Sequence, residues 1–280
     1  PSTTITANGP VTYTVTYAGN GNTGGTLPSD SNNYLTGTTV NVLFTPLPTK
    51  TGFSFAGWSD GVTTYTNGGT TSFTMGSSNV TLTAQWTVLP TTKTFKSTGS
   101  QDGWILESTE TSGVGGSMNA TATTFNLGDD VSNKQYRVIL SFNTANLPET
   151  MTIKKVTLKI KKSGLFFGAD PFTKLGALTV DIRKPSFGTS ALQLTDFQVA
   201  PGTNGKLAVG FFGKLPALNW YTSTLKYTAY PFINRAGLTQ FRLRFARDDN
   251  NNRIAEYMKF FSGNAGAASR PVLTIQYTVP

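Results

Sequence analysis

The sequence contains neither histidine nor cysteine, and these two absences narrow the chemistry open to the chain. Without cysteine there is no disulfide framework, no thiolate metal site and no thiol nucleophile. Without histidine the commonest general base, the serine–histidine arrangement and nearly all zinc sites are excluded. We therefore expect a protein that is not an enzyme and that uses no cofactor and no metal.

Acidic residues are the remaining source of catalytic chemistry, because a glycosidase needs only a pair of carboxyl groups. The sequence offers seven candidates: Glu107, Glu110, Asp129, Asp130, Asp248, Asp249 and Glu256. They are too scattered to be paired by sequence. Residues 248–252 concentrate oxygen atoms that suit Ca²⁺ but lack the spaced calcium-loop pattern. A polar turn is favoured there, and calcium binding stays an open alternative.

Charge is also scarce, since charged residues make up 13% of the chain, about half the share of an ordinary soluble domain. Residues 1–90 carry one lysine and two aspartates, net −1, whereas residues 91–280 carry 22 basic and 12 acidic residues, net +10. A positive surface favours anionic partners. We expect an acidic polysaccharide or another anionic polymer, with nucleic acid disfavoured.

Long apolar runs are missing too, and no stretch approaches the roughly 18 residues of a membrane helix. We expect no membrane span. Residues 1–10 are polar and are typical of an N-terminal arm or linker. Residues 3–6 are β-prone, so the arm can add a strand to a sheet edge of its own or of a neighbouring molecule. Whether the chain is a monomer, a polymer or a fragment of a longer protein stays open.

What the sequence has in abundance is strand and turn signals, because period-2 alternation dominates and helical periodicity is nearly absent. We predict a mainly β fold with two domains. The best strands are 11–17, 39–44, 53–57, 71–75, 80–86, 136–142, 155–161, 177–183, 238–246, 257–262 and 272–277.

Residues 11–87 carry four marks of one small module, namely Tyr13–Tyr17, the glycine-rich loop Gly19–Pro28, Thr51–Trp58 and Val80–Trp86. Together they resemble the internalin B-repeat, or Listeria-Bacteroides repeat, a β-grasp-like module of bacterial surface proteins. The Phe-x-Gly-Trp step at Phe55, Gly57 and Trp58 is the most specific of them. The resemblance implies a spacer or adhesion module. For Trp58 and Trp86 we favour packing in the small core over a ligand platform.

A short linker, residues 88–92, leads into a second domain, residues 93–280, for which many strands predict a β-sandwich of the jelly-roll type. The segments Tyr136–Phe142, Leu147–Pro148, Ile153–Ile160 and Ser269–Tyr277 resemble the DNRLRE-type sandwich of secreted bacterial proteins. That resemblance implies kinship with carbohydrate-binding modules, some of which recognise acidic sugars. Residues 163–235 depart from the pattern, so binding loops cannot be transferred.

Basic residues alternate with apolar ones on two predicted strands of this domain. If Val156, Leu158 and Ile160 face the core, side chains at alternate positions point outward, which applies to Lys155, Lys159 and Lys161. The same reasoning places Arg242 and Arg244 outward. The functional interpretation is a cationic face whose arginines grip carboxylates, and the favoured alternative is a solvated face that deters edge pairing.

Aromatic residues near turns are the other candidate sugar contacts, with Trp220 and Tyr221 ahead of Trp104, Tyr227 and Tyr230, although buried packing is the default for each. Our leading expectation is a non-catalytic structural or adhesive module at the cell surface or in an extracellular fibre. The alternative is an acidic-polysaccharide-binding module attached to a secreted enzyme. The ligand itself is not identified by the sequence.

Overall fold

The computed structural model describes residues 9–202 and 208–280. Residues 1–8 of the N-terminal arm lie outside this range, so strand addition by the arm stays a prediction. The chain divides into two compact units, Pro1–Leu89 and Pro90–Pro280. In both units the regular secondary structure is almost entirely β-strand, as the alternation predicts. Within the described residues, no helix is both long and apolar enough to cross a lipid bilayer.

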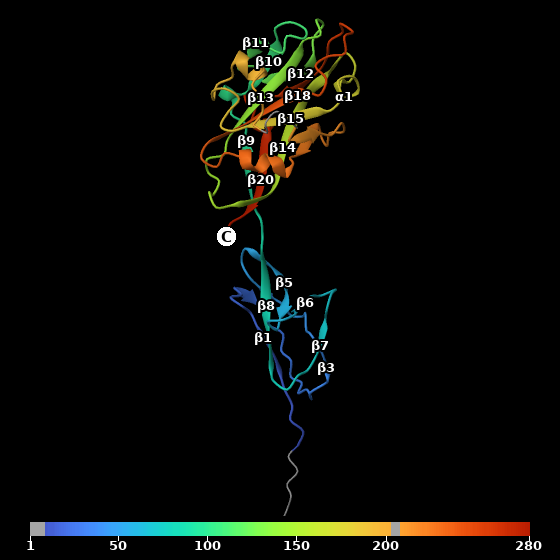
Figure 1. Ribbon diagram of the computed structural model, residues 1–280, viewed down its shortest axis with the longest axis vertical. Coiled ribbons are helices and arrows are strands. Elements are labelled where there is room, and N and C mark those ends of the chain that lie inside the picture. Colours follow the sequence, from blue (N-terminus) through green and yellow to red (C-terminus); the bar gives the residue numbers. More distant parts are fainter. Residues whose placement is uncertain (1–8, 203–207) are drawn as a thin grey trace, which may run out of the picture. The chain divides into compact units, whose positions relative to one another are not determined.

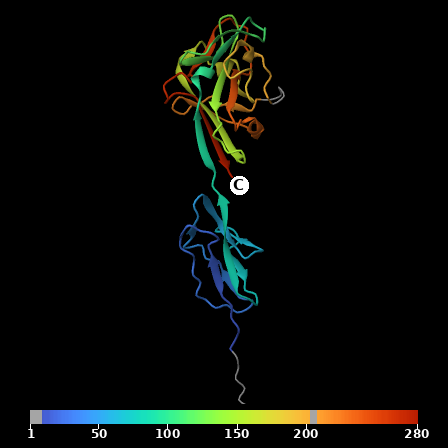
Figure 2. The same ribbon diagram turned by 90° about the vertical axis from the view of Figure 1, so that its left-hand side faces the viewer.

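The first unit is a small sheet centred on one long strand, β8 (Figures 1 and 2). Strand order is β1-β8-β5-β6, with β1 parallel to β8 and the other pairs antiparallel. Two short ladders, β2 with β4 and β3 with β7, complete the unit. The strands are β1 (Val15–Ala18), β2 (Gly24–Gly25), β3 (Thr39–Asn41), β4 (Pro48–Thr49), β5 (Phe53–Ser59), β6 (Thr64–Tyr65), β7 (Ser72–Thr74) and β8 (Val80–Val88).

The core of this unit forms around Trp58, which is fully buried and whose indole N–H donates to the Leu43 carbonyl at 3.0 Å. Tyr17 packs edge-on against it, with ring centroids 4.9 Å apart. Trp86 is half-buried beside the same core. Gly57 precedes Trp58 at a φ of +141°, and a Cβ there would lie 2.5 Å from the Tyr65 carbonyl. The Phe-x-Gly-Trp step is therefore a packing device, because only glycine fits.

The second unit is one curled sheet whose order is β16-β15-β18-β13-β12-β19-β14-β20-β9, with β10 paired to β13, β11 paired to β10, and β17 paired to β14. This is consistent with the predicted β-sandwich. Its strands are β9 (Thr91–Lys96), β10 (Gly103–Glu107), β11 (Gly115–Asn119), β12 (Thr124–Asp129), β13 (Gln135–Asn143), β14 (Thr152–Phe167), β15 (Leu178–Arg183), β16 (Gly210–Phe212), β17 (Trp220–Thr224), β18 (Leu238–Phe245), β19 (Glu256–Phe261) and β20 (Val272–Thr278).

Among the residues described in this unit, helical structure is limited to α1 (Pro171–Lys174) and three 3₁₀ turns, Gly99–Gln101, Leu194–Phe197 and Tyr227–Phe232. The main core lies between the two halves of the curled sheet and includes Leu140, Leu158 and Phe260, all fully buried. A smaller cluster lies elsewhere and contains Ile105, Ile139, Phe187, Leu192 and Phe197. Since Ile139 alternates with the core residues Val138 and Leu140, this second cluster lies on the opposite face of β13.

Candidate functional site

Strand β14 presents its lysines on one face, as the alternation predicts. Val156, Leu158 and Ile160 are fully buried in the main core. Lys155 and Lys159, which alternate with them, are exposed, and Lys161 is half-buried. The hydrophobic residues thus fix the strand's orientation, and the amino groups lie on the outer side.

The strands beside β14 extend this outer surface with polar and basic residues. Lys159 lies opposite Thr222 of β17 and Val272 of β20, and Val272 lies opposite Lys96 of β9. Strands β9 and β20 run side by side in both views of the fold (Figures 1 and 2). We call this surface the lysine–threonine face. It consists of Thr92, Thr94, Lys96, Lys155, Thr157, Lys159, Lys161, Trp220, Thr222, Thr224, Val272, Thr274 and Gln276, and none of these is acidic.

Strand geometry sets the spacing of the amino groups on this face. Neighbouring strands lie about 4.8 Å apart, and a strand rises about 3.3 Å per residue. Lys96 and Lys159 are separated by one intervening strand, which places their backbones roughly 10 Å apart. Lys155 and Lys159 are four residues apart, roughly 13 Å along β14. The positive charges on this face are therefore roughly 10–13 Å apart, a spacing that an extended polymer lying across the strands can match.

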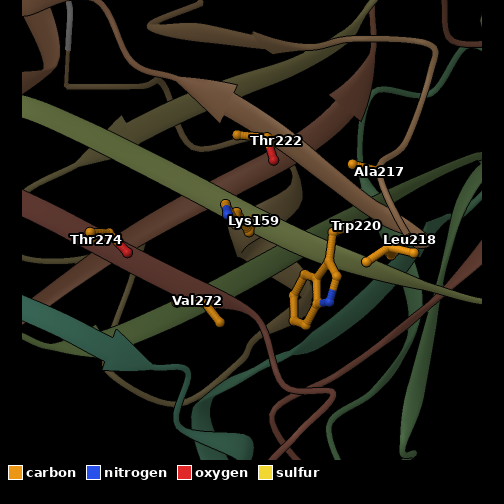
Figure 3. Close-up of a pocket in the computed structure, with 7 residues that line it drawn as sticks. All are labelled: Lys159, Ala217, Leu218, Trp220, Thr222, Val272 and Thr274. Carbon is orange, nitrogen blue, oxygen red and sulfur yellow. The ribbon is translucent and has the colours of Figure 1, made fainter.

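A hollow of about 400 Å³ lies on the lysine–threonine face (Figure 3). Lys159, Trp220 and Val272 line it from β14, β17 and β20, and Leu218 closes it from the turn before β17. Trp220 is half-buried, so part of its ring is accessible. The hollow combines an aromatic surface, an amino group and threonine hydroxyls, which are the groups that contact a charged sugar.

Lys161 is held between aromatic rings beside this hollow. Its amino nitrogen lies 5.9 Å from the centroid of Trp220 and 5.8 Å from that of Phe261, and it donates to the Ser269 hydroxyl at 3.3 Å. A cation over an aromatic ring is attracted to the ring's negative face. Lys161 is thus held beside Trp220, whereas the side chains of Lys155 and Lys159 are exposed to solvent.

The lysines of this face lack acidic partners within the described residues. There, ion pairs within 4.0 Å join Lys134 to Asp130 and Asp181 to both Arg242 and Arg244. All three pairs involve residues outside the lysine–threonine face. Its positive charge is therefore balanced by solvent ions, which an anionic polymer can replace.

The prediction that Arg242 belongs to an exposed cationic face is wrong, because its side chain is buried. It alternates with the core residues Phe241 and Leu243 as expected, but it is only 3% exposed. Its guanidinium bonds to Asp181 at 3.0 Å and donates to three backbone carbonyls, at residues 196, 197 and 199. The segment that follows β15 covers this face of the sheet. Arg242 therefore supports the fold and is closed to a polymer.

Two other predicted contacts also change. Arg244 lies beside Arg242 and its side chain is 30% exposed, with its Nε 3.4 Å from an Asp181 oxygen. Tyr221 was predicted as a sugar contact, but it is 2% exposed and stacks on Phe172 in the main core. Trp220 alone of the tryptophan–tyrosine pair faces the hollow, since adjacent residues of a strand point to opposite sides.

The structure brings together acidic residues that the sequence left scattered. Glu107, Asp129, Asp249 and Glu256 are all buried, each less than 10% exposed. Glu107 and Asp129 end β10 and β12, Glu256 begins β19, and Asp249 lies in the turn between β18 and β19. Among the described residues, no group of three or more aspartates or glutamates is arranged to hold a metal ion by itself.

Comparison with known families bears on the first unit. Residues 13–85 match the Listeria-Bacteroides repeat domain. This confirms the resemblance drawn from the opening strand, the glycine-rich loop and the Phe-x-Gly-Trp step, and it indicates a repeat of the surface-associated bacterial type. No curated protein matches the chain. The resemblance of residues 93–280 to the DNRLRE-type sandwich stays a prediction.

Proposed function

We propose that the chain is a non-catalytic, extracellular structural or adhesive segment of a bacterial surface protein or fibre. The first unit serves as a spacer, and the second holds an anionic polymer on the lysine–threonine face. The observation that carries the proposal is the composition of that face, where four lysines and a row of threonines meet without one acidic residue. The repeat match supports the surface location.

The binding mode follows from exposure and charge. Lys96, Lys155 and Lys159 are exposed, and ammonium groups in water are strongly hydrated point charges. Such contacts favour many weak, exchangeable interactions over a single rigid site. Attraction between exposed charges is screened over about 8 Å at physiological ionic strength, so adhesion should be strong at low salt and weaken as salt rises.

The hollow favours a second candidate function, an acidic-polysaccharide-binding module attached to a secreted enzyme. The half-buried Trp220 offers a flat surface next to the amino group of Lys159. A uronate residue combines a ring that stacks on an aromatic surface with a carboxylate that meets an amine. In this case affinity depends on Trp220 as well as on charge.

Calorimetric titration of the whole chain with polygalacturonate tests the proposal, with neutral dextran as the comparison polymer. The double substitution Lys155→Ala and Lys159→Ala should reduce polygalacturonate affinity several-fold at low salt. The matched control removes two exposed lysines that lie off this face, Lys174 and Lys184. Equal affinity of both double variants would refute the face as the binding surface.

The substitution Trp220→Ala separates the two candidate functions. Stacking of a nucleobase on an aromatic side chain contributes on the order of 1–3 kcal/mol, and we expect a sugar ring that packs flat on Trp220 to lose binding free energy at the low end of this range in the variant. Loss of binding to short uronate oligomers would therefore support the module with a defined sugar subsite. Retained polymer binding with the same salt dependence would support charge-based adhesion.

A further inference from the structure

Four buried carboxyl groups gather at one end of the second unit, away from the lysine–threonine face. Asp129 is fully buried, and Glu107, Asp249 and Glu256 are 3%, 9% and 2% exposed. Two of them end strands, the third begins a strand, and the fourth lies in the turn before that strand. Buried acids are normally paired with a base or bound to a metal, because an isolated buried charge costs several kcal/mol.

Backbone geometry brings these groups into one cluster. Asp129 lies opposite Glu256 in the β12–β19 ladder, and its Oδ1 accepts the Glu256 backbone N–H at 3.1 Å. Gly128 makes the approach feasible, since a Cβ there would collide with the Glu256 carbonyl. The negative charges of Glu256 and Asp249, together with burial as the larger cause, raise the pKa of Asp129 to about 7.

Asp249 is the link to the remaining acids. Its Oδ1 accepts the Asn251 backbone N–H at 2.8 Å, and the neighbouring Asn250 donates from its side-chain amide to Glu256. Burial raises the pKa of Asp249, and the charges of Asp248, Glu110 and Glu107 add to the effect. The Asn250–Glu256 contact holds the β18–β19 turn, and Asp249 with it, against the paired ends of β12 and β19 that carry Asp129 and Glu256.

The hydrogen-bond partners of the four acids are uncharged, so they do not neutralise the negative charge of the cluster. Glu107 accepts from the backbone N–H groups of Gly113 and Gln135, and Glu256 accepts from the side-chain amides of Asn250 and Asn252. None of the four acids has a lysine or arginine within 4.0 Å in the described part of the chain. The Asp129 Oδ2 atom is buried without any hydrogen-bond partner there. An unpartnered carboxylate oxygen inside an acidic cluster is a free ligand atom.

We propose that this cluster binds a Ca²⁺ ion, with Asp129 and Asp249 as its charged ligands. Within residues 9–202 and 208–280, no three acidic side chains are arranged to hold a metal ion together. Amide oxygens, backbone carbonyls and water would therefore supply the remaining ligands of the ion. Ca²⁺ accepts six to eight such oxygens in flexible geometry, whereas Mg²⁺ demands a near-ideal octahedron and keeps its waters. The ion neutralises the cluster and ties the β12–β13 and β18–β19 turns together.

Titration of the whole chain with CaCl₂ at pH 7.5 tests the proposal, with thermal unfolding in EDTA and in excess calcium as a second readout. The parent should bind one ion saturably below about 10 mM, a limit above the range of extracellular calcium modules. Calcium at about 100 times its Kd should raise the Tm of the second unit by roughly 5–10 °C. Mg²⁺ should bind at least about ten-fold more weakly.

The variants Asp129→Asn and Asp249→Asn should each weaken calcium binding at least about ten-fold, because ligand charge sets affinity at such sites. The control Glu149→Gln also removes one acid, but an exposed one outside the cluster, and it should bind calcium like the parent. Asp129→Asn keeps an oxygen for the Glu256 N–H and relieves repulsion. We therefore expect its Tm in EDTA to equal or exceed the parent's.

Four results would overturn the proposal. They are a parent without calcium-dependent heat or Tm shift, equal affinity for Mg²⁺, unchanged calcium affinity in both aspartate variants, and equal loss in Glu149→Gln. The first of these, combined with a higher Tm for Asp129→Asn, would show that protons alone neutralise the cluster. None of these results depends on polymer binding, so the lysine–threonine face is tested separately.

Discussion

Asp102 gives the second unit a pH-dependent stability that can be derived from its contacts. The residue is fully buried. Its Oδ1 accepts the Ser141 backbone N–H at 2.8 Å, and its Oδ2 accepts the Gly263 N–H at 3.1 Å. Burial raises the pKa of Asp102 to about 7, although these bonds and the charge of Arg270 oppose the rise. The side chain therefore joins β13 to the turn after β19.

The sign of the effect follows from the two states. Between the unfolded pKa of 3.8 and the folded value, the folded chain holds a proton that the unfolded chain has released. The free energy of unfolding therefore falls as pH rises through this window, by about 1.4 kcal/mol per pH unit. The stabilisation is complete below the unfolded pKa. About 4 kcal/mol is lost by pH 8.

Asp102→Asn removes this dependence because the amide does not titrate. The amide has one carbonyl oxygen, so one of the two backbone N–H groups loses its acceptor at a cost of about 1–3 kcal/mol. We expect the variant to be less stable than the parent at pH 4 and as stable or more stable at pH 8.5. Denaturant unfolding monitored by circular dichroism at several pH values measures the difference. Other groups titrate equally in both proteins, so a constant difference from pH 4 to 8.5 would refute the reasoning.

Three further predictions concern the two units. Gly57→Ala should destabilise the first unit by at least about 1–3 kcal/mol, the cost of the backbone strain, with the clash against the Tyr65 carbonyl added to it, and calorimetry should show the transition of the second unit unmoved. Arg242→Ala should destabilise the second unit by about 3–5 kcal/mol because it leaves Asp181 buried without its main partner, whereas Lys159→Ala should change denaturant stability by less than about 0.5 kcal/mol. Residues 9–89 and 90–280 should each fold when expressed alone, and an unfolded circular dichroism spectrum from either fragment would contradict this.

Period-2 alternation predicted the strands that have one buried and one exposed side. Lys155–Lys161 falls inside β14, and Val272–Tyr277 falls inside β20. The sequence could not show that β14 continues to Phe167, because Lys161, Lys162, Ser163 and Gly164 interrupt the apolar pattern. Nor did it show β10, where the run Ile105, Leu106 and Glu107 is buried on both sides. β9 also begins at Thr91, two residues before the predicted domain start.

Sites assembled from distant segments were the least predictable. Asp129 and Asp249 are 120 residues apart in sequence, and only the pairing of β12 with β19 and the β18–β19 turn bring them together. The oxygen-rich run at 248–252 was the available signal, because it marked one half of the cluster. The sequence around Asp129 carried no such signal, since in sequence a buried acid at the end of an apolar strand looks the same as an exposed acid in a turn.

In the sequence, the lysines of β14 and the arginines of β18 predicted the same kind of exposed basic face. In the structure Lys155 and Lys159 are exposed whereas Arg242 is buried, and the difference follows from the residue type. Arginine has five donors in a planar fork and is weakly hydrated, so Arg242 can be buried against Asp181 and three carbonyls. Lysine is compact and strongly hydrated, and Lys155 and Lys159 stay at the surface. A strand on which arginine alternates with core residues can therefore be covered by a later segment, as residues 184–199 cover β18. A strand on which lysine alternates with core residues resists such covering, and Lys155 and Lys159 of β14 are exposed accordingly.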